Sequence, residues 1–481
     1  MSRQIRRIGV VLALMLVALL VNITVIQVVL ARDYRERPGN QRLLLAEYDR
    51  ERGPILVGAN PAARSVETGN TLRYLRTYDD GPLYAPITGF YSLIYGATGL
   101  ERTENRVLTG KSDLFFVDRI SQLFAGRQPV GGAVTTTIDA AAQAAAFKGL
   151  KGKVGAVVAI EPATGRILAS VQSPSFDPNL LTSQDPEAIR AYYEELKSDP
   201  AKPLLNRPIV ALNPPGSTFK LVTAAAALAS GLYTPDSILP GPASYQLPLS
   251  TSELQNWNRK ECGPDGKVTL RQALAISCNT AFAWLGVQLG DEALRKQAEL
   301  MGFDTSFQIP LKAATSRFPA ELDEPQTALS AIGQFDVRAT ALQMAMVGAA
   351  IGNNGATMQP YLVQEVRGPD LAILQTTEPT KFEDAMTPLN AAQLTEMMVN
   401  VVENGTGSNA KISGVRVAGK TGTAETDNER PAVAWFVAFA PAQSPKVAVA
   451  VVIEDSRATE ISGNGLAAPI AREVMKAVLR Q

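Results

Sequence analysis

Ser217 and Lys220 are a pair of residues whose types and spacing could carry out a reaction. They open a nearly continuous apolar run that ends at Gly231, which predicts a helix over residues 217–230. Residues three apart share one face of a helix, so the serine hydroxyl and the lysine amine would lie close together. Burial disfavours a charged lysine, and a neutral amine could take the proton of the serine. Taken alone, such a pair is more often a helix-capping serine followed by a lysine that reaches solvent.

A second element could assist this serine. Ser277 and Asn279 follow an amphipathic segment, residues 270–276, and place a hydroxyl and an amide near a helix end. Alone, this pattern is usually a solvated loop.

A third element has the letters KTGT and lies in a run that is typical of a strand. Alternation along a strand turns its first and third residues to one face and its second and fourth to the other. Such a strand could pair with an extended peptide, while its lysine attracts a carboxylate. A surface lysine on an ordinary strand is the alternative for this element alone. Its residues are Lys420, Thr421, Gly422 and Thr423.

The composition excludes several classes of function. The sequence has no histidine, which removes Ser-His-Asp and Cys-His catalysis and the commonest metal ligand, and neither a metal site nor a cofactor is predicted. Lys+Arg and Asp+Glu both total 46, without a basic block, so binding to nucleic acid is not expected. The two cysteines, Cys262 and Cys278, could form one disulfide in an oxidising compartment or remain small buried thiols.

The N-terminal segment is predicted to cross a membrane once. Residues 8–31 are almost entirely apolar, long enough at about 1.5 Å per helical residue for a hydrocarbon core of ~30 Å. A cleaved signal peptide is the alternative, but its apolar core usually has only about 7–15 residues. Residues 1–7 would form a cytoplasmic tail, and the remaining chain would lie outside the cell. Three arginines stand on each side of the span, so this orientation depends on the short tail and on the chemistry argued below.

The remaining chain is predicted to form two domains that meet near residue 133. Residues 32–132 contain short strand-like pieces without helical periodicity and are expected to form a non-catalytic spacer domain. Residues 133–481 begin and end with strand-like runs around a mainly helical middle, which predicts an α/β domain with an antiparallel sheet flanked by helices. The expected strands are 133–138, 154–160, 166–172, 415–424, 434–440 and 446–453, with helices at 140–150 and 466–479.

The order S-x-x-K, S-x-N and K-T-G, on helix, loop and strand, resembles the motif set of the class B penicillin-binding proteins of the PbpA type. The resemblance covers nearly the whole chain, including residues 84–110, 156–179 and 205–220. It implies the α/β (α+β) transpeptidase fold shared with serine β-lactamases. It also implies that residues 32–132 form a pedestal or dimerisation domain.

The resemblance assigns a role to each motif residue. Ser217 would be the nucleophile, Lys220 its base, and Ser277 with Asn279 a pair that relays protons and orients the substrate. Lys420, Thr421, Gly422 and Thr423 would bind the substrate and its carboxylate.

Two further details concern the surroundings of these motifs. The backbone amides of Ser217 and Thr423 would form an oxyanion hole. The sequence departs from the family at Phe335, where a second glycine is expected after Gly333. Cys278 lies inside S-x-N, and a bridge to Cys262 would brace the loop between them.

The implied function is that of a peptidoglycan D,D-transpeptidase. Such an enzyme cross-links stem peptides through a serine acyl-enzyme at D-Ala-D-Ala and is acylated covalently by β-lactam antibiotics. A D,D-carboxypeptidase or a β-lactamase of the same fold is an alternative, although the sequence lacks the E-x-x-L-N element of class A β-lactamases. A non-catalytic penicillin-binding scaffold or sensor is another. No glycosyltransferase domain is evident, so the family resemblance suggests a SEDS-type membrane partner similar to RodA or FtsW.

Overall fold

Helix α1 (Arg3–Thr24) opens the computed structural model, which describes residues 3–30, 48–69, 72–115, 130–424, 432–456, 458 and 461–481. It continues as a π-helical turn, η1 (Val25–Val29). Within these described ranges, one helix is long and apolar enough to cross a membrane, over Ile5–Val29. The predicted span ends at residue 31, which lies outside the described residues together with 32–47.

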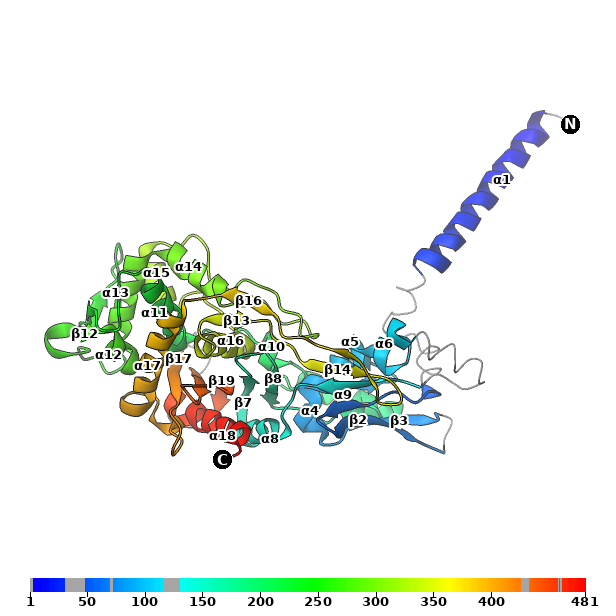
Figure 1. The fold of residues 1–481 in the computed structure, drawn as a ribbon. Helices are drawn as coiled ribbons and strands as arrows, with labels where there is room; N and C mark the ends of the chain where they lie inside the picture. The colour runs from blue at the N-terminus through cyan, green and yellow to red at the C-terminus, as the bar shows by residue number, and fades with distance from the viewer. Residues whose placement is uncertain are drawn as a thin grey trace.

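A five-stranded antiparallel sheet lies at the centre of the C-terminal region (Figure 1). Its order is β17-β18-β19-β7-β8, so two strands from the start of the region pair with three from its end. This confirms the prediction of an α/β fold whose sheet is assembled from distant segments. β17 forms one edge and is paired on one side only. The strands are β7 (Lys153–Ile160), β8 (Ile167–Ser173), β17 (Ala418–Ala424), β18 (Val433–Ala440) and β19 (Val447–Ser456).

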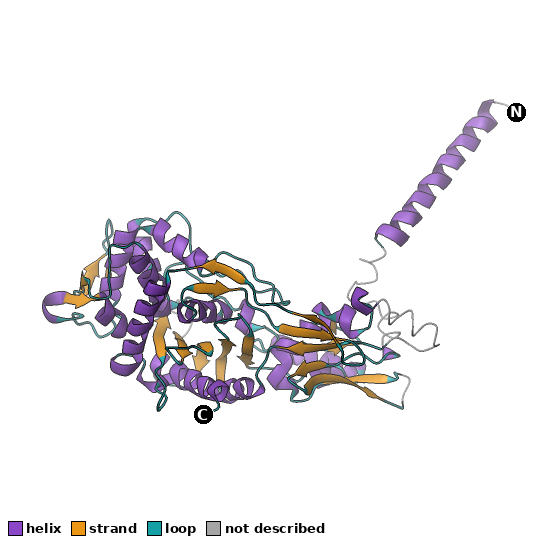
Figure 2. Ribbon diagram, in the orientation of Figure 1, coloured by secondary structure: helices purple, strands orange, loops and turns teal. Residues whose placement is uncertain are grey.

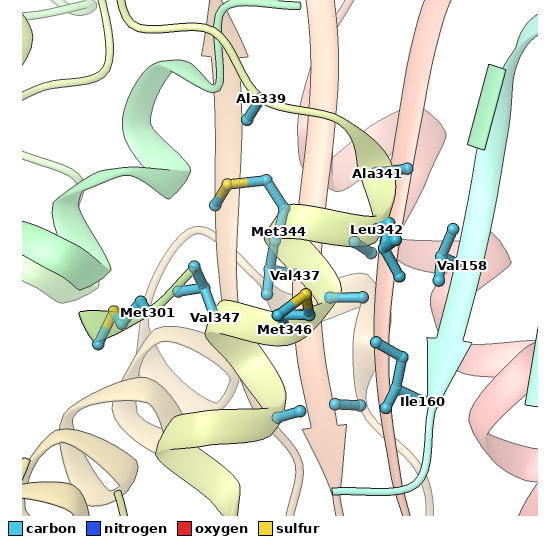
Figure 3. Close-up of a cluster of buried hydrophobic side chains, with 14 of the residues drawn as sticks. Val158, Ile160, Met301, Ala339, Ala341, Leu342, Met344, Met346, Val347 and Val437 are labelled. Atoms are coloured by element: carbon cyan, nitrogen blue, oxygen red, sulfur yellow. The ribbon is translucent and has the colours of Figure 1, made fainter. Parts of the chain in front are cut away.

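Helices cover both faces of this sheet, because strand alternation sends apolar side chains in both directions. On one face, Val158 and Val437 pack against Leu342 and Met344 of α16 (Figure 3). On the other face, Val157 and its neighbours pack under α8 and α18. The helices are α8 (Ala140–Leu150), α16 (Ala341–Gly352) and α18 (Ala468–Leu479).

A second, six-stranded sheet belongs to the N-terminal part of the molecule, with the order β15-β14-β6-β1-β2-β3. β1 and β6 are parallel, and the other neighbours are antiparallel. Figure 2 shows the strands of the two sheets as separate groups. The strands are β1 (Ile55–Val57), β2 (Asn60–Glu67), β3 (Tyr74–Thr77), β6 (Ala133–Thr136), β14 (Val363–Arg367) and β15 (Ile373–Thr376).

Three strands of this second sheet come from beyond residue 132. β6, expected at the start of the second domain, pairs with β1, and β14 with β15 extends the sheet from within the region expected to be mainly helical. The middle of the chain is therefore less helical than predicted. All four residues of β15 are exposed, so the segment lacks the buried alternation that identifies a strand in a sequence.

A helical layer packs beside the five-stranded sheet and carries two of the three motifs. Its central member, α11 (Lys220–Ala229), is buried on nearly all sides and contacts α13, α14 and α17. The predicted helix over residues 217–230 begins as a 3-10 turn, η4 (Gly216–Thr218), before α11. The other helices are α12 (Leu270–Ala275), α13 (Asn279–Leu289), α14 (Asp291–Leu300), α15 (Glu324–Ser330) and α17 (Pro388–Asn404).

The remaining elements complete the described fold. In the N-terminal part they are α4 (Gly81–Thr88), β4 (Tyr91–Ser92), β5 (Gly96–Ala97), α5 (Gly99–Thr103), α6 (Asn105–Leu108) and η2 (Asp113–Phe115). Further along the chain they are η3 (Pro178–Leu181), α9 (Pro186–Ser198), α10 (Arg207–Val210), β9 (Ile238–Pro240), β10 (Ser244–Gln246), β11 (Glu253–Gln255), η5 (Pro264–Gly266), β12 (Lys267–Thr269), β13 (Ala356–Met358), β16 (Lys381–Asp384), η6 (Ser408–Ala410) and η7 (Gly463–Ala467).

Candidate active site

Ser217 lies in the 3-10 turn that starts the buried helix α11, where it is half-buried. The turn is fixed from one side, because the amide of Gly216 donates to the carbonyl of Gly333 at 2.9 Å. Gly216 has a φ of 51°, which favours glycine, and a Cβ there would lie 2.9 Å from the carbonyl oxygen of Thr423. The end of β17 therefore lies directly against the turn that carries Ser217.

Gly422 makes the same approach from the strand side. A Cβ on Gly422 would lie 2.9 Å from Thr218 Cγ2 and 3.0 Å from the carbonyl oxygen of Pro215. Trp435, on the neighbouring β18, donates from Nε1 to the carbonyl of Pro214 at 2.9 Å. These contacts bring the S-x-x-K and K-T-G motifs together, although they are two hundred residues apart in the chain.

Lys220 is fully buried, and oxygen atoms of the S-x-N motif surround its amine. Nζ donates to the carbonyl of Ser277 at 2.8 Å and to Asn279 Oδ1 at 2.7 Å, and it lies 3.3 Å from Ser277 Oγ. None of the described carboxylates forms an ion pair with it. Burial lowers the pKa of Lys220 well below that of an exposed lysine, and the nearby charge of Lys420 lowers it further.

The burial of Lys220 favours its neutral amine, which has two N–H donors and one lone pair. Its two shortest contacts are to oxygens that can only accept. The orientation of the Asn279 amide is fixed, because its Nδ2 donates to the carbonyl of Gln255 at 3.1 Å. In the neutral form both donors would go to these two oxygens, and the lone pair would be left to accept a proton.

Ser277 connects the two buried lysines. Its φ of 60° is left-handed, and this turn between α12 and α13 directs both its carbonyl and its hydroxyl toward Lys220. Lys420 Nζ donates to the same hydroxyl at 2.9 Å and to the carbonyl of Thr421 at 2.8 Å. Ser277 Oγ is therefore placed to pass a proton along this row of groups.

The residues of the K-T-G motif differ in how exposed they are to solvent. Lys420 is fully buried, and burial lowers its pKa to about 7. The hydroxyl of Thr421 lies 2.7 Å from that of Thr406, whereas Thr423 is exposed at the end of the edge strand. Thr423 is thus the member of this motif most open to a ligand.

The structure joins most of the predicted site residues directly. Lys220, Ser277, Asn279 and Lys420 form one hydrogen-bonded group, and Ser217 lies three residues before Lys220 in the turn that contacts β17. Within the described ranges, no group of three or more Asp, Glu or Cys side chains could hold a metal ion.

Several supporting residues were not predicted, namely Asn256, Gly333, Thr406 and Trp435. They lie on other elements, and only the three-dimensional fold brings them to the motifs. Gly333 differs from the other three residues, because it lies in the run of residues where the family resemblance predicts two glycines.

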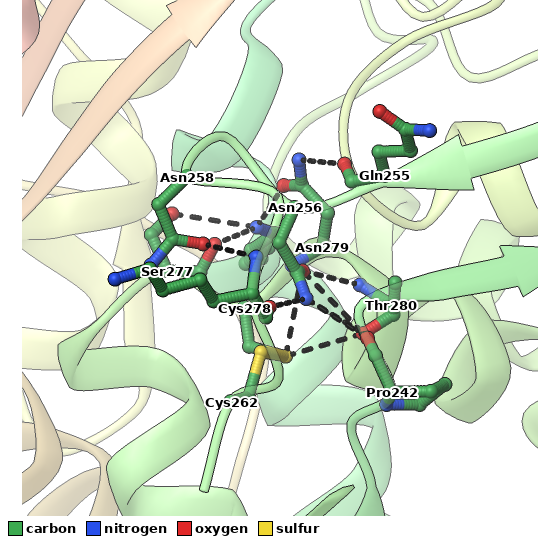
Figure 4. Close-up of a disulfide and its surroundings, with 11 residues drawn as sticks. Pro242, Gln255, Asn256, Asn258, Cys262, Ser277, Cys278, Asn279 and Thr280 are labelled. Atoms are coloured by element: carbon green, nitrogen blue, oxygen red, sulfur yellow. Dashed lines mark hydrogen bonds between the residues drawn. A yellow bond between two sulfur atoms is a disulfide. The ribbon is translucent and has the colours of Figure 1, made fainter.

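Cys262 and Cys278 form a disulfide with their Cα atoms 6.0 Å apart (Figure 4). The bridge ties the loop after β11 to the residue between Ser277 and Asn279. Gly241 packs beneath it, because a Cβ there would lie 2.9 Å from Cys262 Cβ and 3.4 Å from Cys278 Sγ. The S-x-N turn is therefore held covalently as well as by hydrogen bonds.

The pH dependence of the reaction of Ser217 with a β-lactam should report both lysines. Lys220 accepts a proton only above its lowered pKa, so the second-order rate constant should fall as the pH decreases. Lys420 loses its charge above about pH 7, which should weaken attraction of the β-lactam carboxylate and give a second, alkaline decline.

In Lys420→Met the alkaline limb of this pH profile should vanish. The acid limb should move to higher pH, because the charge that lowers the pKa of Lys220 is gone. Identical pH profiles for the two proteins would contradict this assignment.

Phe335 occupies the position where a glycine was expected, and it adopts a left-handed backbone with a φ of 56°. A residue other than glycine loses about 1–2 kcal/mol in this conformation. Phe335→Gly should therefore unfold at a higher temperature than Phe335→Ala, which removes the same ring but keeps the strain. The expected difference is about 1 kcal/mol after the entropic cost of glycine. Equal thermal stability of the two variants would show that the loop relaxes without cost.

Comparison with known proteins agrees with this geometry. Residues 155–476 match the penicillin binding protein transpeptidase domain, and residues 52–134 match the penicillin binding protein A dimerisation domain. The chain is 46% identical over 491 residues to the peptidoglycan D,D-transpeptidase PbpA of Mycolicibacterium smegmatis, with 100% of each chain covered. It is 32% identical to MrdA of Haemophilus influenzae, with 80% of this chain and 63% of that protein covered.

Solved structures give the same result. The ceftriaxone acyl-enzyme complex of penicillin-binding protein A from M. tuberculosis aligns with a TM-score of 0.87 and 44% identity, over 90% of this chain and 100% of that one. The transpeptidase match covers well over half of the chain. This chain is therefore a member of the penicillin-binding protein transpeptidase family.

Proposed function

We propose that this protein is a peptidoglycan D,D-transpeptidase that forms an acyl-enzyme at D-Ala-D-Ala and is acylated by β-lactams. The observation that carries the proposal is the fully buried amine of Lys220, which is bonded to Ser277 and Asn279 and belongs to the residue three positions after Ser217. The names of its relatives support the substrate class, since one is called a peptidoglycan D,D-transpeptidase and another is a β-lactam acyl-enzyme complex.

In the acylation step, Ser217 Oγ attacks the carbonyl carbon of the penultimate D-alanine, and Lys220 takes the hydroxyl proton. The helix N-terminus favours the negative charge that develops near Ser217. Backbone amides of Ser217 and Thr423 stabilise the oxyanion, each donor contributing about 3–4 kcal/mol in enzymes where this has been measured. When the peptide bond breaks, the proton passes through Ser277 to the leaving amine, and D-alanine departs.

Recognition of the substrate is assigned to the edge strand β17. An extended stem peptide can pair with this free edge through main-chain hydrogen bonds. Lys420, Thr421 and Thr423 then meet the terminal carboxylate, and Gly422 allows the close approach of η4 to the strand. In the second step the amine of a neighbouring stem peptide attacks the ester and gives its proton to Lys220. Lys220 returns this proton to Ser217 Oγ as the ester bond breaks, which regenerates the serine.

The fate of the acyl group distinguishes this proposal from hydrolysis by the same fold. Incubation with a D-Ala-D-Ala stem peptide and a D-amino acid acceptor should give mainly the exchanged peptide at acceptor concentrations that saturate the rate. A D,D-carboxypeptidase would give only the shortened peptide, and a β-lactamase would hydrolyse penicillin many times per second. A non-catalytic scaffold or sensor would bind penicillin without releasing D-alanine from the peptide.

The location of the protein is part of the same proposal. Helix α1 with η1 would anchor the chain, residues 1–7 would remain in the cytoplasm, and the catalytic domain would lie outside the membrane, where stem peptides are found. Residues 32–132 would act as pedestal or dimerisation domain and, with the anchor, contact a SEDS-type glycosyltransferase similar to RodA or FtsW. Protease added to intact spheroplasts should digest residues 48–481 and spare the anchor, whereas a cytoplasmic catalytic domain would resist digestion.

A further inference from the structure

Asn256 is a buried polar residue outside the three motifs, in the loop between β11 and the disulfide. Its side chain is only 4% exposed, and all of its hydrogen-bonding capacity is used. Nδ2 donates to the carbonyls of Pro242 and Lys260, both at 2.9 Å. These two carbonyls require a donor, so the orientation of the amide is fixed with Oδ1 toward α13 (Figure 4).

The first turn of α13 depends on that oxygen. A helix N-terminus has free backbone N–H groups, and the residue before α13, Cys278, makes no side-chain cap. Its sulfur is in the disulfide and carries no hydrogen, so its approach to Asn256 is a contact only. Asn256 Oδ1 accepts from the amides of Asn279 at 2.9 Å and Thr280 at 3.2 Å. A residue more than 20 positions earlier in the chain therefore caps this helix.

The same loop also holds the side chain of Asn279. The carbonyl of Gln255 accepts from Asn279 Nδ2 at 3.1 Å, and Oδ1 of the same amide accepts from Lys220 at 2.7 Å. Asn279 is thus fixed at its backbone by Asn256 and at its amide by Gln255. Movement of this loop would alter the distance between Asn279 and the base.

We infer that Asn256 is a positioning residue for the reaction of Ser217, acting through Asn279 on Lys220. The inference rests on the proposed function, because it assumes that Lys220 is the base. The Cys262–Cys278 bridge supports it, because it joins the loop that carries Asn256 to the residue that precedes α13. Loss of the Asn256 contacts should loosen the first turn of α13, admit water to Lys220 and reduce the desolvation that keeps its amine neutral.

The test compares Asn256→Ala with Asn258→Ala in the full-length protein. Asn258 lies in the same loop and is exposed, and its Oδ1 accepts from the amide of Lys260 at 3.1 Å. The readout is the second-order rate constant of labelling by fluorescent penicillin as a function of pH. Asn256→Ala should lose tenfold or more near neutral pH, since a misplacement of ~1 Å can cost 10²-fold. Its acid limb should move to higher pH, and Asn258→Ala should match the wild type.

A purely structural role would lower the fraction of protein that is labelled while leaving the rate constant and the acid limb unchanged, and this result would overturn the inference. If Asn256→Ala does not fold, Asn256→Ser decides, with Asn258→Ser as the matched control. The shorter side chain removes the donor to Pro242 and Lys260 and withdraws the acceptor from the amides of Asn279 and Thr280. The acid limb of Asn256→Ser should lie at higher pH than that of Asn258→Ser, and equal limbs with equal rate constants in the two variants would overturn the inference.

The proposed function can fail independently of this inference. If the wild-type protein is not labelled at all, the proposed function is wrong. If the wild type is labelled and Asn256→Ala behaves as the wild type does, only the role of Asn256 is wrong.

Discussion

Replacing Ser217 with alanine should abolish covalent labelling by fluorescent penicillin. The ester bond requires the Ser217 oxygen, because the other hydroxyl near Lys220, that of Ser277, is buried and accepts a hydrogen bond from Lys420. Ser217 is half-buried and lies in the middle of η4, so the substitution removes one hydroxyl from a turn that Gly216 and Gly333 continue to hold. The measurement is the labelled fraction on a denaturing gel after prolonged incubation.

Ser230→Ala is the matched control for this variant. Ser230 follows the other end of the same helix, where its exposed side chain donates to the carbonyl of Ala227 at 2.7 Å. Labelling of Ser230→Ala should equal that of the wild type. Undiminished labelling of a folded Ser217→Ala protein would mean that a different residue is the nucleophile.

Replacing Lys220 with methionine should lower the rate constant of labelling by about 10²–10⁴-fold, the usual contribution of a positioned general base. Methionine approximates the volume of the buried side chain but cannot accept the proton of Ser217. The protein should still fold. The carbonyl of Ser277 and Asn279 Oδ1 each lose a donor, at a cost of about 1–3 kcal/mol per group, but the burial of an ionisable amine no longer opposes folding.

The control for charge and residue type is Lys296→Met. Lys296 is an exposed residue of α14, a helix that packs against α11, so its replacement removes a lysine near the same helix without touching the site. Both variants are compared by stopped-flow labelling and by circular dichroism. A Lys220→Met protein that is folded and labelled within about threefold of the wild-type rate would be incompatible with a proton transfer to Lys220.

The core of the fold could be predicted because its strands have strong and continuous apolar patterns. β18 and most of β19 are buried on both faces, so residues 433–440 and 447–453 are apolar throughout and their strand identity is plain from the sequence. The second sheet is different. β6 lies in a predicted strand, but its partners are β1, about 80 residues earlier, and β14, about 230 residues later, and nothing local signals either pairing. β14 and β15 pair with each other locally, but β15 is wholly exposed and lacks a strand pattern.

The motif residues could be predicted for a related reason. Ser217 lies three residues before Lys220, and Ser277 lies two residues before Asn279. A sequence displays such short spacings directly. The causes of the lowered pKa of Lys220 are not local: they are its burial by the packed elements around it and the charge of Lys420 in a distant strand. Asn256 has no distinguishing sequence signal, because it resembles any loop asparagine until α13 is packed against it.

The most direct test of the central claim is to locate the adduct after the full-length protein reacts with penicillin. Peptide mass spectrometry should find one added penicilloyl group, on the peptide that contains Ser217, with a lifetime much longer than the time needed for labelling. A stable adduct on any other residue, or complete reaction of penicillin without an adduct on Ser217, would contradict the role assigned to this serine.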